Sequence, residues 1–357
     1  MKKLNKFTIH FKDRLDKAIK KININGKRFL IAVDENYKMK GFLSDSDIRR
    51  SLLKDINKNS SIEKLLNKRP IYILDNKNRE KKINIILKNN KNILDIYSAI
   101  PIIDKNKILK DIFFINNYSK SIKNFVAILM AGGKGLRLGN ITKKTPKPLI
   151  AFNNQPYIIM LIRKLLNANC NKIFISLHYK QHMFIRIITK EFSNEVKSNI
   201  IYFIKEIEPL GTAGSIKKVI TKNNEDILII NTDTVFNFNI ENLILYHKQN
   251  NSFFTVTTKE HTTYVNYGVI TTKNNLIKSL KEKPTLNFNI MTGIYFGNHM
   301  IKSLIKKSES IDMPELIKRM INKKKKVVAF NLIENIIDFG LKSNLKILKK
   351  KFDKYFI

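Results

Sequence analysis

One short segment constrains the fold of this 357-residue chain more than any other. Residues 125–131 (FVAILMA) form a continuous apolar run, which is typical of a parallel strand buried on both faces. The loop Gly132-Gly133-Lys134-Gly135-Leu136-Arg137 follows at once, and glycines after a strand let backbone N–H groups approach a phosphate closely. It is not a Walker A loop, which ends in Gly-Lys-Ser/Thr, nor a dinucleotide fingerprint, because Leu138 stands at the third glycine position. The segment therefore predicts an α/β fold with an anion-binding turn after its first strand.

Two further positions fit such a site. Lys147 lies between Pro146 and Pro148, and because proline fixes its own backbone angle, this rigidity suits a lysine that must point at a phosphate. Residues 227–230 form a second buried strand, and Asp233 follows it. An acid after a parallel strand lies at the sheet edge where ligands bind in open α/β sheets.

The stretch from Ala131 to Pro148 resembles the signature of the sugar-1-phosphate nucleotidyltransferases, also called nucleoside-diphosphate-sugar pyrophosphorylases. The resemblance extends over about residues 125–350 and implies a doubly wound, mostly parallel sheet with helices on both faces. Met291 stands where the family usually has an Asn that contacts a sugar hydroxyl. The later segments that match, in the family's order, are 210–214, 231–233, 267–270, 282–284, 292–295, 312–316 and 338–340.

The resemblance also implies a reaction, in which a sugar 1-phosphate attacks the α-phosphorus of a nucleoside triphosphate and pyrophosphate leaves. Such a transfer needs positioning and charge neutralisation more than a general base, which agrees with the lack of a credible histidine base. His178 and His182 are interpreted as structural. The implied roles are catalysis and triphosphate binding for Arg137 and Lys147, nucleotide binding for Gly132, Gly133, Gly135 and Gly211, sugar-phosphate binding for Gly268, Glu282 and Lys283, and Mg²⁺ binding for Asp233 and Asp338.

The first 120 residues have a different texture. We expect a helix over residues 13–22, strands over 29–33 and 39–43, a helix from Ser44, another from residue 61, and a second strand-turn-strand over 100–114. Residues 41–50 (GFLSDSDIRR) resemble a CBS domain, which implies that Ser44 and Asp47 bind an adenine nucleotide. The alternative is that Ser44 is a helix N-cap and Asp47 a partner of the helix dipole.

The predicted organisation is therefore a regulatory α+β domain over residues 1–120, a linker at 116–121 and a catalytic domain over 125–357. The regulatory domain is expected to be a tandem CBS pair whose second copy is degenerate. A hydrophobic fraction of 43% is sufficient for a core in both domains.

The formal net charge of +38 first suggests a nucleic-acid partner. However, the excess is spread over the whole chain, and only 10 of the 67 basic residues are Arg, the residue that specific recognition favours. We therefore expect no nucleic-acid partner, and we expect the positive field to attract small phosphorylated substrates.

No apolar stretch is long enough for a membrane helix, and the N-terminus lacks a signal-peptide core, so a cytoplasmic protein without a membrane partner is expected. A homo-oligomer is also expected. The single cysteine, Cys170, excludes an internal disulfide and a Cys-based zinc site.

The arrangement resembles the GDP-glucosamine- and mannose-1-phosphate guanylyltransferases of bacterial surface-glycan and nonulosonate pathways, so GTP is the expected nucleotide, with thymidylyl or uridylyl transfer as the alternative. A glycosyltransferase is a second class, disfavoured because the motifs around Lys147 and Lys283 suit a free triphosphate. A non-catalytic regulatory homologue is a third, disfavoured by the presence of both Asp233 and Asp338.

Overall fold

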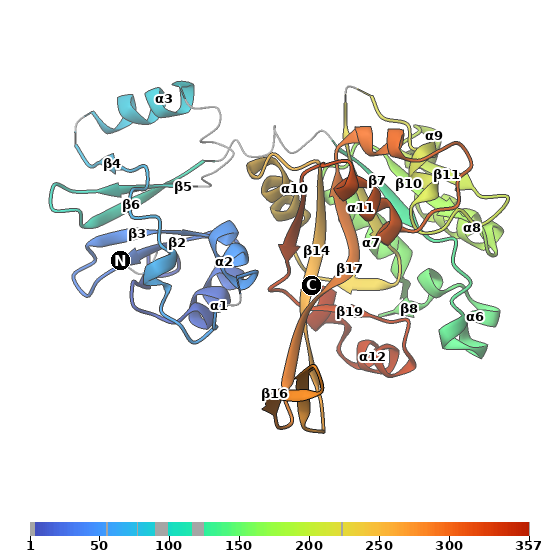
Figure 1. Ribbon diagram of the computed structural model, residues 1–357. Coiled ribbons are helices and arrows are strands. Elements are labelled where there is room, and N and C mark those ends of the chain that lie inside the picture. The colour runs from blue at the N-terminus through green and yellow to red at the C-terminus, as the bar shows by residue number, and fades with distance from the viewer. Residues whose placement is uncertain are drawn as a thin grey trace.

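The computed structural model describes residues 4–54, 56–76, 78–89, 99–115, 125–222 and 224–356. These form an N-terminal module (residues 4–115) and a larger sheet domain (residues 125–356), which lie beside each other (Figure 1). The predicted linker at residues 116–121 lies outside the described residues.

A seven-stranded sheet forms the centre of the sheet domain. Four of its six strand pairs are parallel, whereas β17 runs antiparallel to both of its neighbours. The prediction of a mostly parallel sheet is therefore confirmed, with the correction that the sheet is mixed. In order across the sheet the strands are β11 (Ile201–Lys205), β10 (Ile173–Leu177), β7 (Phe125–Met130), β12 (Asp226–Asn231), β17 (Thr285–Gly297), β14 (Phe254–Tyr264) and β18 (Val327–Asn331).

The apolar run in β7 is buried on both faces because side chains alternate along a strand. Phe125, Ala127 and Leu129 face one core, and Val126 and Ile128 face the other. The helices on the first face are α7 (Tyr157–Asn167), α8 (Gln181–Glu191), α10 (Ile240–Gln249) and α12 (Lys342–Phe356). On the second face lie the 3₁₀ turns Gly214–Lys218 and His299–Leu304 and α11 (Met313–Asn322).

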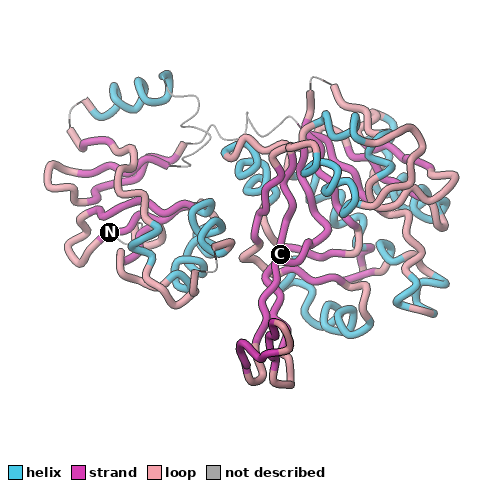
Figure 2. Tube along the Cα trace, viewed as in Figure 1, coloured by secondary structure: helices cyan, strands magenta, loops and turns pink. Residues whose placement is uncertain are grey.

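Short elements complete the domain (Figure 2). The C-terminal helix α12 is longer, and Leu345, Leu348 and Phe352 pack it against the core. The remaining elements are α6 (Asn140–Lys144), α9 (Ser193–Lys197), the strand pair β8 (Ala151–Phe152) and β9 (Gln155–Pro156), and the strand pair β13 (Thr234–Phe236) and β19 (Ile336–Asp338).

Strands β14 and β17 continue beyond the sheet as a two-stranded ribbon, which projects from the domain in Figure 1. A small hairpin of β15 (Val269–Lys273) and β16 (Leu276–Lys281) lies at its far end. We call residues 259–291 the arm. Nearly all of its side chains are exposed.

The N-terminal module consists of two similar units. In each, the first strand runs parallel to the second, which forms an antiparallel hairpin with the third. The two hairpins meet through reciprocal bonds: Met39 N–H donates to the Lys107 carbonyl at 2.8 Å, and Leu109 N–H donates to that of Tyr37 at 2.9 Å. Unit one contains β1 (Thr8–His10), α1 (Leu15–Asn25), β2 (Phe29–Val33), β3 (Met39–Ser44) and α2 (Asp45–Leu52), and unit two contains β4 (Ile73–Leu74), α3 (Arg79–Asn89), β5 (Ala99–Ile103) and β6 (Leu109–Phe114).

The elements expected in this module are present with one exception, whereas β1, β4 and α3 were not expected. The helix expected from residue 61 is only a 3₁₀ turn, Ile62–Leu65, because the chain is already extended again at Leu66. The similarity of the two units is clearest in their hairpin turns. Asp34 and Asp104 each accept hydrogen bonds from the backbone N–H groups of the residues two and four positions later.

A buried arginine joins the module to the sheet domain. Arg49 of α2 has no exposed surface; its Nε lies 2.7 Å from Asp45 Oδ2 and its Nη2 lies 2.7 Å from Glu334 Oε1. The guanidinium also donates to the Asn331 carbonyl at 2.8 Å and lies 4.0 Å from the centre of the Phe330 ring. Breaking a buried pair by removing one partner typically costs ~3–5 kcal/mol, so Arg49 is a strong link between the two parts.

Candidate active site

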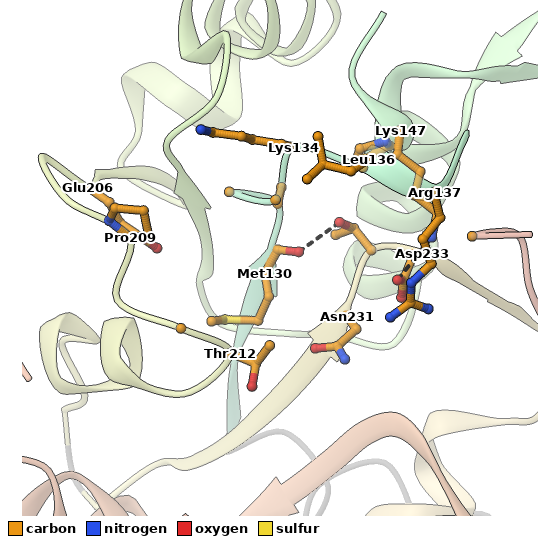
Figure 3. Close-up of a pocket in the computed structure, with 18 residues that line it drawn as sticks. Met130, Lys134, Leu136, Arg137, Lys147, Glu206, Pro209, Thr212, Asn231 and Asp233 are labelled. Atoms are coloured by element: carbon orange, nitrogen blue, oxygen red, sulfur yellow. Dashed lines mark hydrogen bonds and ion pairs between the residues drawn. The ribbon is translucent and has the colours of Figure 1, made fainter. Parts of the chain in front are cut away.

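A cleft of about 460 Å³ opens where β7 and β12 end (Figure 3). Its position at the carboxyl ends of adjacent parallel strands is the one at which open α/β sheets bind ligands. The predicted residues that line it are Gly132, Gly133, Gly135, Arg137, Lys147, Gly211 and Asp233, together with Gly340 beside Asp338.

The glycine loop keeps a tight conformation that a larger residue would disturb. Gly135 has φ +64°, and a Cβ there would lie 2.9 Å from Cγ2 of Thr142. The Thr142 hydroxyl donates to the Gly135 carbonyl at 2.9 Å, which holds the loop against α6. Figure 3 shows Arg137 on the same side of the cleft as Lys147 and Asp233, whereas Lys134 extends away from them.

Lys147 lies between the two predicted metal ligands. Its Nζ is 3.0 Å from Asp233 Oδ2 and 3.3 Å from Asp338 Oδ1, and it lies 5.1 Å from the centre of the Phe339 ring. The lysine is buried, with 8% of its surface exposed, whereas the two carboxylates keep 40% and 46% of their side-chain surface exposed. Together the three groups carry one net negative charge at a partly open position.

Pairing of the short strands β13 and β19 brings the two carboxylates together. Thr234 lies opposite Asp338, and the Phe339 N–H donates to the Asp233 carbonyl at 3.0 Å. Gly340 completes the turn, since its N–H donates to Asp338 Oδ1 at 2.6 Å and a Cβ there would lie 2.6 Å from Lys147 Nζ. The sequence Asp-Phe-Gly at 338–340 thus places a carboxylate against the lysine.

The carboxylates of Asp233 and Asp338 fit a Mg²⁺ site in which substrate phosphates and waters supply the other ligands. Among the described residues, no group of three or more His, Cys, Asp or Glu side chains could hold a metal ion. Mg²⁺ is commonly held by one or two carboxylates plus waters and substrate phosphates, so Asp233 and Asp338 are a sufficient protein contribution.

Glu206 forms one wall of the cleft and was not foreseen from the sequence. It is 7% exposed; its Oε2 accepts the Leu210 N–H at 3.0 Å, and its Oε1 accepts the Ser176 hydroxyl. The His178 Nδ1 lies 3.2 Å from the Glu206 carbonyl, which agrees with a structural role for that histidine. A clue was available, because Glu206 lies a few residues before the Leu210–Gly214 glycine turn.

The second glycine turn is fixed against the start of α11. Gly211 has φ +72°, and a Cβ there would lie 2.6 Å from the Ile311 carbonyl oxygen. Asp312 Oδ1 accepts the Thr212 N–H at 2.9 Å, and Thr212 Oγ1 accepts the Met313 N–H at 2.8 Å. Segments 210–214 and 312–316, which both resemble the family signature, therefore hold each other in place.

Asp338 itself does not line the cleft but contacts Lys147, which does, whereas the three predicted sugar-phosphate residues lie away from the cleft lining. Gly268, Glu282 and Lys283 lie on the arm, where all three are exposed. The ribbon that carries them extends from the sheet beyond an irregularity in its pairing between Val256 and Thr258. Their contact with a sugar phosphate therefore stays a prediction.

Ser44 and Asp47 bind each other at the start of α2. The Asp47 N–H donates to Ser44 Oγ at 3.2 Å, and the Ser44 N–H donates to Asp47 Oδ2 at 3.0 Å. This reciprocal capping box is the alternative role considered for the pair. Binding of an adenine nucleotide by these residues stays a prediction.

The fold and the cleft define an α/β protein that brings a glycine loop, a lysine and two carboxylates together at the carboxyl ends of its central strands. A sequence profile of the family described as nucleotidyl transferase matches residues 126–347, and the chain belongs to this family.

Individual relatives match the same part of the chain. The mannose-1-phosphate guanyltransferase of Pichia angusta is 30% identical over 221 residues, which is 60% of this chain and 60% of that relative. The D-glycero-alpha-D-manno-heptose 1-phosphate guanylyltransferase of Aneurinibacillus thermoaerophilus is 28% identical over 231 residues, 64% of this chain and 99% of that relative. The solved structure of HddC from Yersinia pseudotuberculosis matches with a TM-score of 0.49 and 23% identity over 64% of this chain and 99% of that one. The chain thus spans about 60% of the length of the Pichia relative.

None of the helices in the described part of the chain has the length and apolarity needed to cross a membrane.

Proposed function

We propose that the protein transfers a nucleotidyl group from GTP to a sugar 1-phosphate and releases pyrophosphate, with Mg²⁺ as cofactor. The observation that carries the proposal is the position of Lys147 between Asp233 and Asp338 in a cleft formed by the glycine loop. The two guanylyltransferases to which the chain is similar act on sugar 1-phosphates by name, which supports the same reaction class here.

In this reaction an oxygen of the sugar phosphate forms a bond to the α-phosphorus, and the bond from the α-phosphorus to the bridging oxygen breaks. Pyrophosphate takes the electron pair. The attacking phosphate is already an anion, so no residue needs to remove a proton. Backbone N–H groups after Gly132 would bind the triphosphate, and Arg137 and Lys147 would neutralise its charge and hold it in line. When bound by Asp233 and Asp338, Mg²⁺ supplies further charge neutralisation at the phosphate oxygens.

Glu206 supports guanine as the base. A carboxylate has four lone-pair positions, and hydrogen bonds from Leu210 and Ser176 occupy two of them. Guanine carries two adjacent N–H donors on one edge, and a carboxylate can accept both. Because a pyrimidine base does not present this pair of donors, the arrangement favours GTP over the thymidylyl and uridylyl alternatives.

Substitution of Glu206 tests this preference. In Glu206→Gln, one acceptor oxygen becomes a donor, so we expect kcat/KM for GTP to fall about 10- to 100-fold and the preference for GTP over inosine triphosphate to disappear. Glu208→Gln is the matched control, because Glu208 is exposed and close in sequence. An unchanged preference in Glu206→Gln would assign base recognition elsewhere.

We further propose that the sugar phosphate meets Glu282 and Lys283 on the arm, with Gly268 beside them. The proximity of these positions supports a common site, since a Cβ on Gly268 would lie 2.9 Å from Glu282 Oε2. Lys283→Ala should raise KM for the sugar phosphate while KM for GTP stays the same. Equal changes in both constants would contradict this assignment.

The N-terminal module is proposed to be a CBS pair that regulates the enzyme by binding an adenine nucleotide at Ser44 and Asp47. The repeated hairpin units support the pair, and Arg49 provides a route to the cleft. It lies on the helix that Ser44 caps, and its partner Glu334 lies four residues before Asp338. A displacement of α2 would therefore move Glu334 and, through the chain that follows it, the predicted metal ligand Asp338.

This regulation is tested with the full chain. AMP or ATP at millimolar concentration should raise the melting temperature and change turnover, and Asp47→Asn should abolish both effects. Arg49 stays intact in that variant, so the two parts remain joined. If neither nucleotide changes the melting temperature or turnover, the module is structural.

The reaction class is tested by a screen of four nucleoside triphosphates against a panel of sugar 1-phosphates. We expect pyrophosphate release with GTP and a hexose or hexosamine 1-phosphate. A glycosyltransferase would instead release a nucleoside diphosphate from a nucleotide sugar, and a regulatory homologue would turn over no pair of substrates.

A further inference from the structure

The arm has a surface that differs from the rest of this lysine-rich chain. Charged residues make up 27% of the sequence, yet residues 261–272 and 284–291 contain no Asp, Glu, Lys or Arg. The same segments expose large apolar side chains, and exposed apolar surface that lacks charge is typical of an interface with another protein. The large apolar side chains exposed on the arm are Tyr264, Tyr267, Val269, Ile270, Leu276, Ile277, Leu280, Leu286, Phe288, Ile290 and Met291.

One face of β17 concentrates this apolar surface. Leu286, Phe288 and Ile290 alternate along the strand and therefore share a face, with exposed fractions of 41%, 52% and 45%. A two-stranded ribbon is marginally stable in water by itself and gains stability when further strands or a packed surface cover it. The arm therefore needs an additional contact.

The free edge of β17 shows where that contact can form. Strand β12 pairs with this edge only at Ile294–Gly297, and no other described strand pairs with it at residues 285–291. The opposite edge of the ribbon is already covered at its base, where Lys58 Nζ lies 2.6 Å from Glu260 Oε2 and Lys259 Nζ donates to the Glu334 carbonyl at 2.9 Å. Natural proteins usually protect an exposed edge with lysine or proline, and residues 285–291 contain neither.

We propose that this edge pairs with the same edge of a second copy of the chain. The two β17 strands would run antiparallel about a two-fold axis near Phe288, and the two ribbons would form one four-stranded sheet. In this register Phe288 lies opposite Phe288 of the partner subunit, and Leu286 lies opposite Ile290 of the partner subunit. The apolar triplet is symmetric about its centre, so it is complementary to itself, as a two-fold interface requires.

Pairing between two copies uses the edge as it stands. Beyond the irregularity between Val256 and Thr258, the β14–β17 pairing runs without interruption from Met291 to Thr285, so the strand that would meet its partner is regular. The dimer is independent of the proposed reaction, since it rests on the arm's surface and edge alone.

Mass measurement and cross-linking test the dimer. Light scattering of the wild-type chain should give about twice its mass of 41.7 kDa at micromolar concentration. Phe288→Asp places two like charges opposite each other on the axis and should raise the dissociation constant at least about 100-fold. Thr262→Asp is the matched control, because Thr262 lies on the other strand and pairs with Asn287, on the opposite face; it should leave the dimer intact.

A cysteine at the axis gives a second measurement that does not depend on a destabilising charge. In Phe288→Cys, directly opposed residues are close enough for a disulfide, and the native Cys170 is buried, so oxidation should give a cross-linked dimer. A monomeric wild-type chain at tens of micromolar would overturn the proposal. So would a dimer that survives Phe288→Asp and gives no disulfide through Phe288→Cys.

Discussion

Replacement of Lys147 by methionine separates its catalytic role from its contribution to the fold. Methionine keeps an apolar stem against Phe339 and removes the charge that lies 3.0 Å and 3.3 Å from two carboxylates. Because those carboxylates are 40% and 46% exposed, water screens the ion pairs, and each contributes at most about 1 kcal/mol. We therefore expect a loss of about 1 kcal/mol in unfolding free energy, or a fall of about 2–4 °C in melting temperature.

The expected effect on turnover is much larger. Loss of a positioned donor to the charge that develops on phosphate oxygens typically lowers kcat about 100- to 1,000-fold, which corresponds to about 2.7–4 kcal/mol. Pyrophosphate release measures the rate and thermal melting measures the fold, with Lys143→Met as a control because Lys143 is an exposed lysine on α6. Turnover within tenfold of wild type in Lys147→Met would refute the central role given to this lysine.

Three further predictions concern the metal, the nucleotide and the pH dependence of stability. Asp233→Asn should abolish Mg²⁺-dependent turnover, and a Mg²⁺ titration identical to that of wild type would contradict its metal role. Gly211→Ala should weaken GTP binding and lower the melting temperature, because the left-handed φ of +72° costs alanine about 1–2 kcal/mol and its Cβ meets the Ile311 carbonyl; near-normal values of both would show that the turn can adapt. Burial raises the pKa of Asp226 to about 6, so the folded chain holds a proton that the unfolded chain releases near pH 4, and this stabilisation is lost as the pH rises from about 4 to about 6. Over that window, denaturant unfolding should show wild type losing up to about 3 kcal/mol relative to Asp226→Asn, and parallel pH profiles would exclude the shift.

The sequence was sufficient to predict the elements whose pattern is local. The apolar run of β7 and the glycines after it identify a buried strand and its loop, because each depends on neighbouring residues only. Lys147 and Asp233 were also predicted as parts of one site. Their direct contact was not, since the pairing of β13 with β19 joins segments about 100 residues apart and neither short strand has a distinctive pattern.

Other features depend on partners that a pattern does not show. Arg49 lies on an amphipathic helix and has the pattern of a solvated charge, yet partners from two parts of the chain bury it completely. Glu206 is also an isolated acid in the sequence, and only the folded chain places it on the wall of the cleft. The location of Glu282 on the arm follows from the path of a ribbon that leaves the sheet, which the alternation of side chains along its strands does not determine.

The fate of the phosphates tests the central claim most directly. The wild-type protein is incubated with Mg²⁺, a sugar 1-phosphate and GTP that carries label on either the α- or the γ-phosphorus. We predict that the α-label appears in a nucleotide sugar and the γ-label in pyrophosphate, in equal amounts and only when the sugar 1-phosphate is present. Release of the γ-label as inorganic phosphate, or no transfer of the α-label to any sugar 1-phosphate with GTP or another nucleoside triphosphate, would contradict nucleotidyl transfer.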